Sequence, residues 1–553
     1  MAYRQPFTYS ELLNDLTEVI SLVSVTFAGR TFYWASRPIT IESREVGPIQ
    51  FQGGLDADWQ DALSLFNDSP PLVSLSLDLY FPLDVDIAEL VAKGHDLSLA
   101  VGEFSLYPLS PDQPTRLYEE RVTIFQGTVR QPQYGEKGQP IAFSLEANPF
   151  EDTALIPEPA ASVNFDTWPD HDPNVTNRVY PTVFGTPGVY QDSTGAEQIV
   201  PGSPAFGVEI APAAPNLVQK VLVAGHKVAA NRVTLWGTDT AGNFVSSVQD
   251  VVTETDGLGR EVSVIDGILG PLLPAGGALW VTWNQFPLAG GLGRGGLIND
   301  RYTGTRTGAG EVIDYFLRLS TLKLDVGKWN VAADYLNRYY KLSGYVDEEV
   351  SPWEYVKENF IQILPLSLIA TEGGLAPVVW RRDAKKADAV AHLTEGANMA
   401  RVSAVNYERQ KIKNEIRISF APSADEDKYN STAAVVTRPT GVSGQFTTEY
   451  SRASGIRYGT IPEVLESEVI FESSTASEVL QWKHRANCFP YRTVSYRAAI
   501  RFGFLTRGDL VTLTDPALHF DRYLAMIRDV EWDNGRPVLT FVLIDDPPRE
   551  DRP

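Results

Sequence analysis

Residues 291–296 match the glycine pattern of dinucleotide-binding loops, G-x-G-x-x-G, with the sequence GLGRGG. That pattern binds pyrophosphate only when a strand precedes it and a helix follows, because the backbone N–H groups must then point at the phosphates. No helix is predicted here, since residues 297–300 run directly into Gly304 and Gly308. The segment therefore favours a flexible loop, and we expect no cofactor.

The six histidines are too scattered to suggest a metal centre. Only His484 and Cys488 lie one helical turn apart, as two ligands could, and two ligands without a second pair fall short of a zinc site. The remaining histidines are His95, His171, His226, His392 and His519.

Oxygen and nitrogen ligands are densest at Asp166, Asp170, His171 and Asp172. Their spacing is irregular and lacks the central glycine of a calcium loop. Proline, alanine, asparagine and aspartate fill residues 151–176, a composition typical of a linker. We expect a solvated linker without a metal, in which His171→Ala is nearly silent.

Nucleophilic catalysis has no visible basis in the sequence. The nucleophile elbow G-x-S-x-G is absent, and Cys488 lies late in an amphipathic stretch where a buried, inert thiol is expected. The 70 acidic residues allow many spatial carboxylate pairs, and the sequence selects none of them for glycoside cleavage. We therefore expect no enzyme and assign no catalytic, cofactor-binding or metal-binding residue.

Composition indicates an ordinary globular protein. The chain has 553 residues, 43% of them hydrophobic and 21% charged, and this length predicts about three to five domains. The single cysteine excludes an internal disulfide, which fits assembly in a reducing cytoplasm. Residues 1–6 begin no signal peptide, and no apolar run approaches the roughly 20 residues of a membrane span.

The formal charge of −23 argues against a nucleic-acid-binding surface, because such surfaces need Lys and Arg to neutralise phosphates. An acidic surface suits an assembly component, or a conduit through which DNA passes without sticking.

Hydrophobic periodicity predicts a mainly β protein with a helical insertion (β+α). Val73, Leu75, Leu77 and Leu79 alternate with polar residues, as in a strand with one buried face. The only strongly helical block spans about residues 309–365, where Ser351, Pro352 and Glu354 predict a helix start. A polar loop is expected at residues 425–430.

The two ends of the chain repeat one order of elements. A predicted helix at 86–93 is followed by an apolar run, residues 102–106 and a hairpin holding Val129 and Phe143. A predicted helix at 475–489 is followed by a strand at 494–504, residues 508–513 and a hairpin holding Val530 and Phe541. Unrelated β-rich segments that share such patterns are the alternative. We predict that residues 21–155 and 401–553 superpose as related β-barrels.

These patterns predict four domains in which two related β-barrels flank a β-domain and a small helical domain. The expected boundaries are 1–155 for the first barrel, 156–305 for a Gly-rich β-domain, 306–400 for a helical/mixed domain and 401–553 for the second barrel.

Several sequence segments resemble segments of tail-tip proteins of bacteriophages with long non-contractile tails. They are residues 177–188 (NRVYPTVFGTPG), 202–205 (GSPA) and 222–226 (LVAGH). Residues 508–513 (GDLVTL), followed by a terminal hairpin, resemble the second barrel of tail hub (baseplate hub) proteins.

The resemblance implies a virion protein of the tail tip, assembled in the host cytoplasm. It implies a homotrimer whose two barrels per chain form a pseudo-sixfold ring around the DNA passage. The implied partners are the distal tail protein ring, the tape-measure protein and a central tail fibre or tip protein, with no specific nucleic acid binding. A glycan-binding or glycan-cleaving tail protein is the alternative, because 11 Trp and 23 Tyr could supply stacking platforms.

Overall fold

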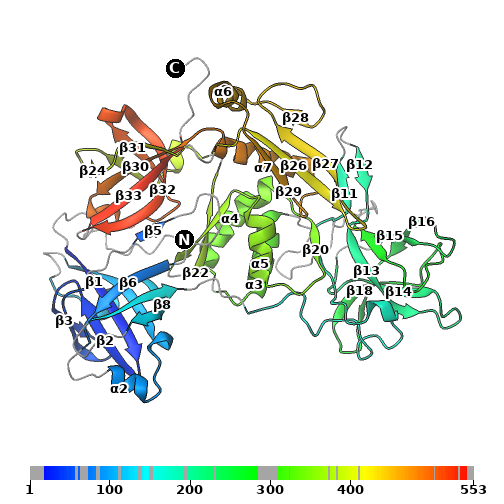
Figure 1. Cartoon of the computed structure of the whole chain (residues 1–553), viewed down its shortest axis with the longest axis horizontal. Helices are drawn as coiled ribbons and strands as arrows, with labels where there is room; N and C mark the ends of the chain where they lie inside the picture. The colour runs from blue at the N-terminus through cyan, green and yellow to red at the C-terminus, as the bar shows by residue number, and fades with distance from the viewer. Residues whose placement is uncertain are drawn as a thin grey trace.

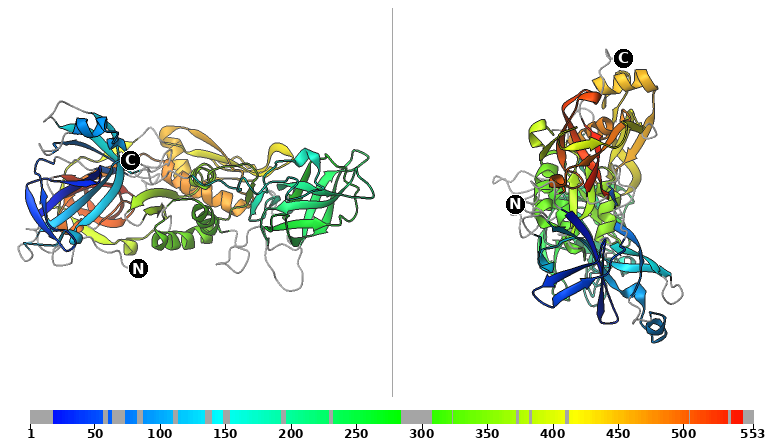
Figure 2. Two further views of the ribbon diagram at one scale, coloured as in Figure 1. Left: turned by 90° about the horizontal axis from the view of Figure 1, so that it is seen from below. Right: turned by 90° about the vertical axis from the view of Figure 1, so that its left-hand side faces the viewer.

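The computed structural model describes residues 18–55, 60–62, 73–81, 87–109, 114–133, 140–147, 153–191, 196–228, 232–283, 308–322, 324–371, 374–381, 384–408, 412–503, 505–533 and 536–544. The fold is mostly β, with a nearly closed barrel, a half-barrel sheet and few helices. This confirms the predicted fold class of a β-rich chain with a helical insertion. Two sheets lie at one end of the molecule, helices lie at its centre, and a β-domain forms the other end (Figures 1 and 2).

The N-terminal sheet is antiparallel and has six strands. Their order is β2 (Arg30–Ala35), β1 (Glu18–Phe27), β7 (Val101–Leu109), β8 (Val122–Gln133), β9 (Ile141–Ala147) and β6 (Val73–Leu79). The hairpin of β3 (Ile39–Ser43) and β4 (Gly47–Phe51) packs beside it. In β6, Leu77 and Leu79 are buried while Asp78 is exposed, as the alternating pattern predicts.

The C-terminal sheet has eight strands. Its main path is β23 (Ala391–Thr394), β31 (Leu510–Asp515), β32 (Phe520–Asp533), β33 (Arg536–Leu543), β30 (Tyr491–Ala498) and β24 (Met399–Arg401). β25 (Asn406–Glu408) pairs with β30, and β5 (Gln60–Ala62) pairs with β32. Because β5 comes from the N-terminal part of the chain, the two sheets are joined by backbone pairing as well as by side chains (Figure 1).

Four strands at each end of the chain share one connectivity. The order β7-β8-β9-β6 in the N-terminal sheet matches β31-β32-β33-β30 in the C-terminal sheet, and every pair in both sets is antiparallel. Leu77 faces Phe143 across the first set, and Val494 faces Phe541 across the second, with all four side chains buried. We name these sets the N-terminal and C-terminal quartets.

The expected equivalence of the two helices is wrong. α2 (Ile87–Ala92) lies between the first and second strands of its quartet, whereas α7 (Ser473–Asn487) precedes the first strand of the other quartet. The flanking strands differ as well, since β1 is antiparallel to β7 and β23 is parallel to β31. The shared connectivity is therefore limited to four strands, and superposition over residues 21–155 and 401–553 stays a prediction.

The β-domain contains a seven-stranded antiparallel sheet. Its order is β16 (Phe244–Asp250), β15 (Arg232–Thr238), β19 (Leu279–Thr282), β13 (Ser203–Ile210), β14 (Val218–Ala224), β18 (Glu261–Asp266) and β17 (Val252–Thr255). The short pairs β10 (Thr182–Phe184) with β20 (Gly344–Val346), and β11 (Val189–Gln191) with β12 (Glu197–Ile199), lie beside it.

Residues expected to form a solvated linker are folded against this sheet. Val163 and Trp168 are buried in one core with Tyr180 and Phe206. The Trp168 indole N–H donates to the Tyr180 hydroxyl at 3.0 Å, and that hydroxyl donates to buried Asp256 at 3.0 Å. The linker prediction is wrong here because a few apolar side chains suffice to anchor a segment whose overall composition is polar.

The centre of the molecule combines helices with smaller sheets. The helices are α3 (Ala309–Leu319), α4 (Val326–Tyr339), α5 (Pro352–Val356), α6 (Glu449–Tyr458) and α7. One hairpin is formed by β21 (Leu366–Thr371) and β22 (Gly374–Val379), and a four-stranded sheet has the order β28 (Gln445–Phe446), β27 (Glu426–Val435), β26 (Glu415–Ser423) and β29 (Pro462–Glu466). The Ser351 hydroxyl accepts the Glu354 N–H at 3.2 Å, which confirms the predicted start of α5.

The hydrophobic cores combine segments that are far apart in the sequence. Phe316 of α3 and Trp353 of α5 share one core with Ile416 of β26 and Leu480 of α7. A second core draws residues from both the N-terminal and C-terminal sheets. The four domain boundaries stay predictions. Among the described residues, no helix is both long and apolar enough to cross a membrane.

Candidate functional site

In the segment at residues 166–172, where a solvated linker without a metal is expected, His171 and Asp172 serve the local fold. His171 is 5% exposed, with its Nδ1 2.6 Å from the Trp168 carbonyl oxygen and its Nε2 2.8 Å from the Thr176 hydroxyl. Asp172 is buried and accepts the Asn174 backbone N–H at 2.9 Å as well as the Gly276 N–H. Asp166 and Asp170 are exposed. Both ring nitrogens of His171 are therefore engaged in hydrogen bonds within the segment.

His484 in α7 and Cys488 at its C-terminal end are both buried. Burial lowers the pKa of His484 to about 4 and raises the pKa of the Cys488 thiol to about 12. The thiol is therefore protonated at neutral pH, where a metal ligand or nucleophile would need the thiolate. Within the ranges that the structure describes, no group of three or more His, Cys, Asp or Glu side chains is placed to hold a metal ion. The glycine motif at 291–296 lies outside those ranges.

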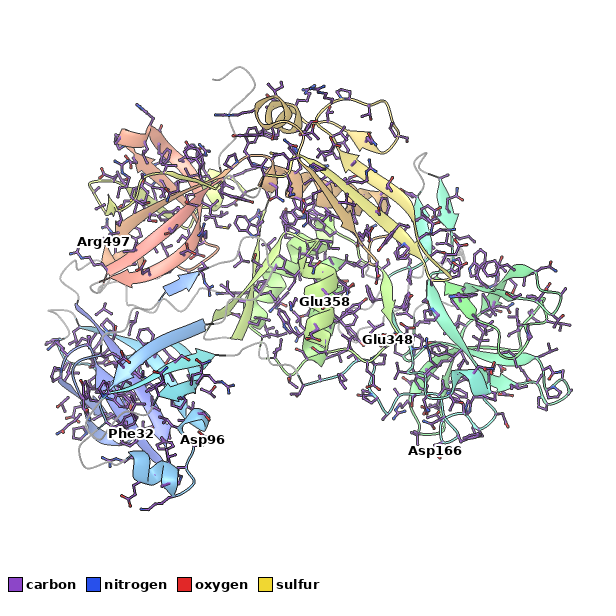
Figure 3. All side chains as sticks on the ribbon, viewed as in Figure 1. Phe32, Asp96, Asp166, Glu348, Glu358 and Arg497 are labelled. Carbon is purple, nitrogen blue, oxygen red and sulfur yellow. The ribbon has the colours of Figure 1, made fainter. Side chains whose placement is uncertain are left out.

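An acidic cleft lies where the β-domain meets the centre of the molecule. Its volume is about 580 Å³. Six carboxylates and one ammonium group line it, together with tyrosine rings. The carboxylates belong to Asp347, Glu348, Glu349, Asp425, Glu426 and Glu468. Figure 3 shows Glu348 between the central helices and the β-domain. We call this feature the acidic cleft.

Four separate segments form the walls of the acidic cleft, one of them represented by Glu468, just after β29. One wall is the connection from β20 to α5, and a second is the turn from β26 to β27. The third includes Gly202, just before β13, where an added Cβ would lie 2.2 Å from the Pro187 carbonyl oxygen. Only glycine fits this approach of two backbones. The expected polar loop at 425–430 is mostly strand, since β27 begins at Glu426.

Hydrogen bonds hold these walls together. The Ala424 N–H donates to the Pro201 carbonyl at 2.9 Å, and the Trp280 indole N–H donates to the Ala424 carbonyl at 3.1 Å. The Tyr355 hydroxyl donates to the Tyr345 carbonyl at 3.1 Å. The turn from β26 to β27 is thus fixed to the β-domain, and the β20 connection is fixed to α5.

The electrostatics of the acidic cleft are strongly negative. Burial raises the pKa of Asp347, and Glu348 raises it further, while Arg178 at 3.3 Å opposes both effects. Burial also raises the pKa of Tyr345 to about 12, with a further contribution from Asp347. Tyr345 and Tyr355 are both neutral at physiological pH, because desolvation raises the pKa of half-buried Tyr355 as well. The excess of carboxylates suits a cation, and the neutral rings suit one with apolar or planar parts.

The acidic runs that line the cleft are present in the sequence, but only the fold shows that they come together. The runs at 347–349 and 425–426 are acidic, but Glu468 and Gly202 are far away in sequence. Acidic runs are usually solvated surface. Nothing in their spacing indicates that the segments meet.

A second surface feature is an aromatic cluster on the β-domain, formed by Trp236, Phe244 and Trp280. Trp236 and Trp280 are directly paired across β15 and β19. Phe244 is 49% exposed and stacks on Trp236 with ring centroids 5.7 Å apart and 20° between the planes. Its ring centroid is 6.0 Å from that of Trp280. Exposed aromatic faces of this kind can stack against apolar faces of a ligand.

No family model matches the chain, and no curated protein matches it. Among solved structures, it is similar to the 43 kDa tail protein of prophage MuSo2 from Shewanella oneidensis, at 10% identity over 95% of this chain and 99% of that one, with a TM-score of 0.33. It is similar to a tail protein from Neisseria meningitidis MC58, at 9% identity over 95% and 97%, with a TM-score of 0.35. It is also similar to the prophage tail protein gp18 from Listeria monocytogenes EGD-e, at 10% identity over 64% of this chain and 93% of that one, with a TM-score of 0.22. Likeness at this level fixes neither the fold nor the function of this chain.

Proposed function

We propose that this chain is a structural protein of a phage tail, and more specifically the hub of the tail tip. In this role three copies form a pseudo-sixfold ring that joins the sixfold tail rings to the threefold tip and encloses the DNA passage. The role involves no catalytic step. Its partners are further copies of the chain, the distal tail protein ring, the tape-measure protein and a central fibre or tip protein.

The observation that supports this proposal is the repeated strand connectivity at the two ends of the chain. The N-terminal and C-terminal quartets have the same order and the same antiparallel pairing. They also lie in sheets that share one hydrophobic core and are bridged by β5. Two similar units held side by side in each of three chains would present six similar docking surfaces around an axis.

The decisive experiment is native mass spectrometry of the purified protein, followed by electron microscopy. The proposal expects a species of three times the 61.0 kDa chain mass and rings with six similar densities around a central opening. A protein that remains monomeric when mixed with the distal tail ring, and monomeric within assembled particles, would contradict it.

Surface glycan binding is the second candidate function, and the aromatic cluster on β15, β16 and β19 favours it. The exposed ring of Phe244 could stack on a sugar ring. Binding of the purified protein to a glycan array, abolished by Phe244→Ala and retained by Val248→Ala on the same strand, would favour this candidate. Release of sugars from such glycans would favour a glycan-cleaving protein over both the tail hub and a protein that only binds glycans.

A further inference from the structure

We propose that His226 makes the joint between the β-domain and the centre of the molecule sensitive to acid. The neutral imidazole accepts the Val183 backbone N–H and locks β10 to the β-domain, whereas the protonated imidazole releases it. The inference does not depend on the hub role, because it follows from the hydrogen bonds and the packing around β10.

Strand β10 belongs to both parts of the molecule. It pairs with β20 of the centre, and two consecutive side chains point into different cores. Val183 is buried in the core of the β-domain, while Phe184 is buried in the central core with its ring centroid 5.4 Å from that of Phe316. Figure 1 shows β20 between the central helices and the sheet that contains β13. A change at β10 therefore alters how the β-domain is attached.

Two hydrogen bonds join β10 to the segment that follows β14. The Gly225 N–H donates to the Pro181 carbonyl at 2.8 Å, and the Val183 N–H donates to the His226 Nε2 at 3.0 Å. The Ser263 hydroxyl donates to the His226 carbonyl oxygen at 2.8 Å and so holds the backbone that carries the ring. One of the two bonds across this part of the joint thus depends on a group that titrates.

The hydrogen bonds of His226 determine which ring nitrogen carries its hydrogen. Nδ1 lies 3.1 Å from the Lys227 carbonyl oxygen, which can only accept, so the hydrogen is on Nδ1. Nε2 is then the acceptor for the Val183 N–H. A proton added to the ring goes to Nε2, where it would face that N–H. Because two donors cannot form a hydrogen bond with each other, protonation breaks the contact and leaves the Val183 N–H without this acceptor.

Burial lowers the pKa of the half-buried His226 below its ordinary value of about 6.5. No charged side chain among the described residues contributes to this shift. Strand β10 has no titratable side chain, and those of the segments around it are Tyr180, Lys220, Lys227, Glu261, Asp266 and Tyr345. Since the folded protein binds fewer protons at His226 than the unfolded chain, the joint is most stable above about pH 6.5 and loses stability as the pH falls below that value.

A second acid-sensitive contact crosses the same joint. Asp347, which follows β20, pairs with Arg178 at 3.3 Å, and burial raises the pKa of its carboxyl. Protonation of Asp347 would weaken this ion pair. A variant whose residue 226 does not titrate keeps the ion pair and loses only the response of His226, so it separates the two groups.

The test is amide hydrogen exchange of the full chain at pH 7.5 and pH 5.0, with labelling times scaled for the pH dependence of the intrinsic exchange rate. We expect peptides that cover residues 181–184 to exchange about tenfold faster at pH 5.0, as for the loss of one hydrogen bond. In His226→Gln this pH dependence should disappear, because the side-chain amide does not titrate. Whether the glutamine accepts the Val183 N–H changes the exchange rate at both pH values alike.

The matched control is His95→Gln, which removes an exposed histidine of the N-terminal region. It should keep the pH response over residues 181–184. Equal exchange of these residues at the two pH values in the parent protein would overturn the proposal, whatever the variants do. The same response in His226→Gln as in the parent would assign it to Asp347 and would also overturn the proposal, as would loss of the response in His95→Gln.

Discussion

At the scale of single residues, His171 was expected in a solvated linker, but in the structure it is buried and makes hydrogen bonds within its own segment. Both ring nitrogens make hydrogen bonds, at 2.6 Å and 2.8 Å, and the residue is 5% exposed. His171→Ala should therefore destabilise the β-domain by about 2 kcal/mol, because a cavity forms and the buried Trp168 carbonyl loses its hydrogen bond. Faster amide hydrogen exchange over residues 163–180 would be the readout.

The control for this substitution is Asp166→Ala, which alters an exposed residue of the same segment (Figure 3). Its exchange pattern should match that of the parent. Equal exchange in both variants would restore the original linker prediction.

Cys488 gives a second prediction at this scale, based on the raised pKa of its thiol. With a pKa of about 12, about one thiol in ten thousand is ionised at pH 8. Because the thiolate is the reacting form, the folded protein should not react with Ellman's reagent at pH 8 over an hour. One equivalent should react promptly after addition of denaturant. Rapid reaction of the folded chain would mean that α7 is not packed as described.

At the scale of elements, the β32–β33 hairpin closes the C-terminal quartet. Asp533 pairs with Arg536, so the connection consists of Asn534 and Gly535, which lie outside the described residues. Asn-Gly favours the positive φ angles of a two-residue hairpin. Gly535→Val should destabilise this hairpin by about 1–3 kcal/mol, since a β-branched residue resists such a conformation.

Hydrogen exchange along β32 and β33 would measure the effect of Gly535→Val, and ring assembly should fall in parallel. The comparison variant is Glu531→Ala, an exposed residue of β32. Normal assembly of the Gly535 variant would show that the hairpin does not hold the strand register.

Local elements were predictable from the sequence because their signals are local. The alternation at Leu77 and Leu79 indicates a strand, and Ser351 with Pro352 indicates a helix start. Connectivity was harder to predict, since helix α2 and helix α7 precede similar strands in sequence but occupy different positions in their quartets. Only strand pairing shows this difference.

The candidate site could not be predicted from the sequence for a related reason. Glu348, Asp425 and Glu468 come from three segments that meet only through long-range packing. Polar composition also concealed the folded segment around Trp168, whose anchoring contacts are few and distant in sequence. Periodicity reports which face of an element is buried, but not which other element covers it.

At the scale of the whole molecule, net charge leads to a prediction about the proposed ring. Three chains of −23 carry −69 together. If the ring surrounds the DNA passage, carboxylates along its inner wall would repel phosphates and let DNA slide without sticking. Electron cryomicroscopy of the assembled tail tip should reveal an inner wall richer in Asp and Glu than in Lys and Arg. The isolated ring should not be retained on immobilised double-stranded DNA at physiological salt. A basic inner wall, or retention on DNA that falls steeply with salt, would instead indicate a protein that grips the DNA, and would separate the ring geometry from the proposed role as an open passage.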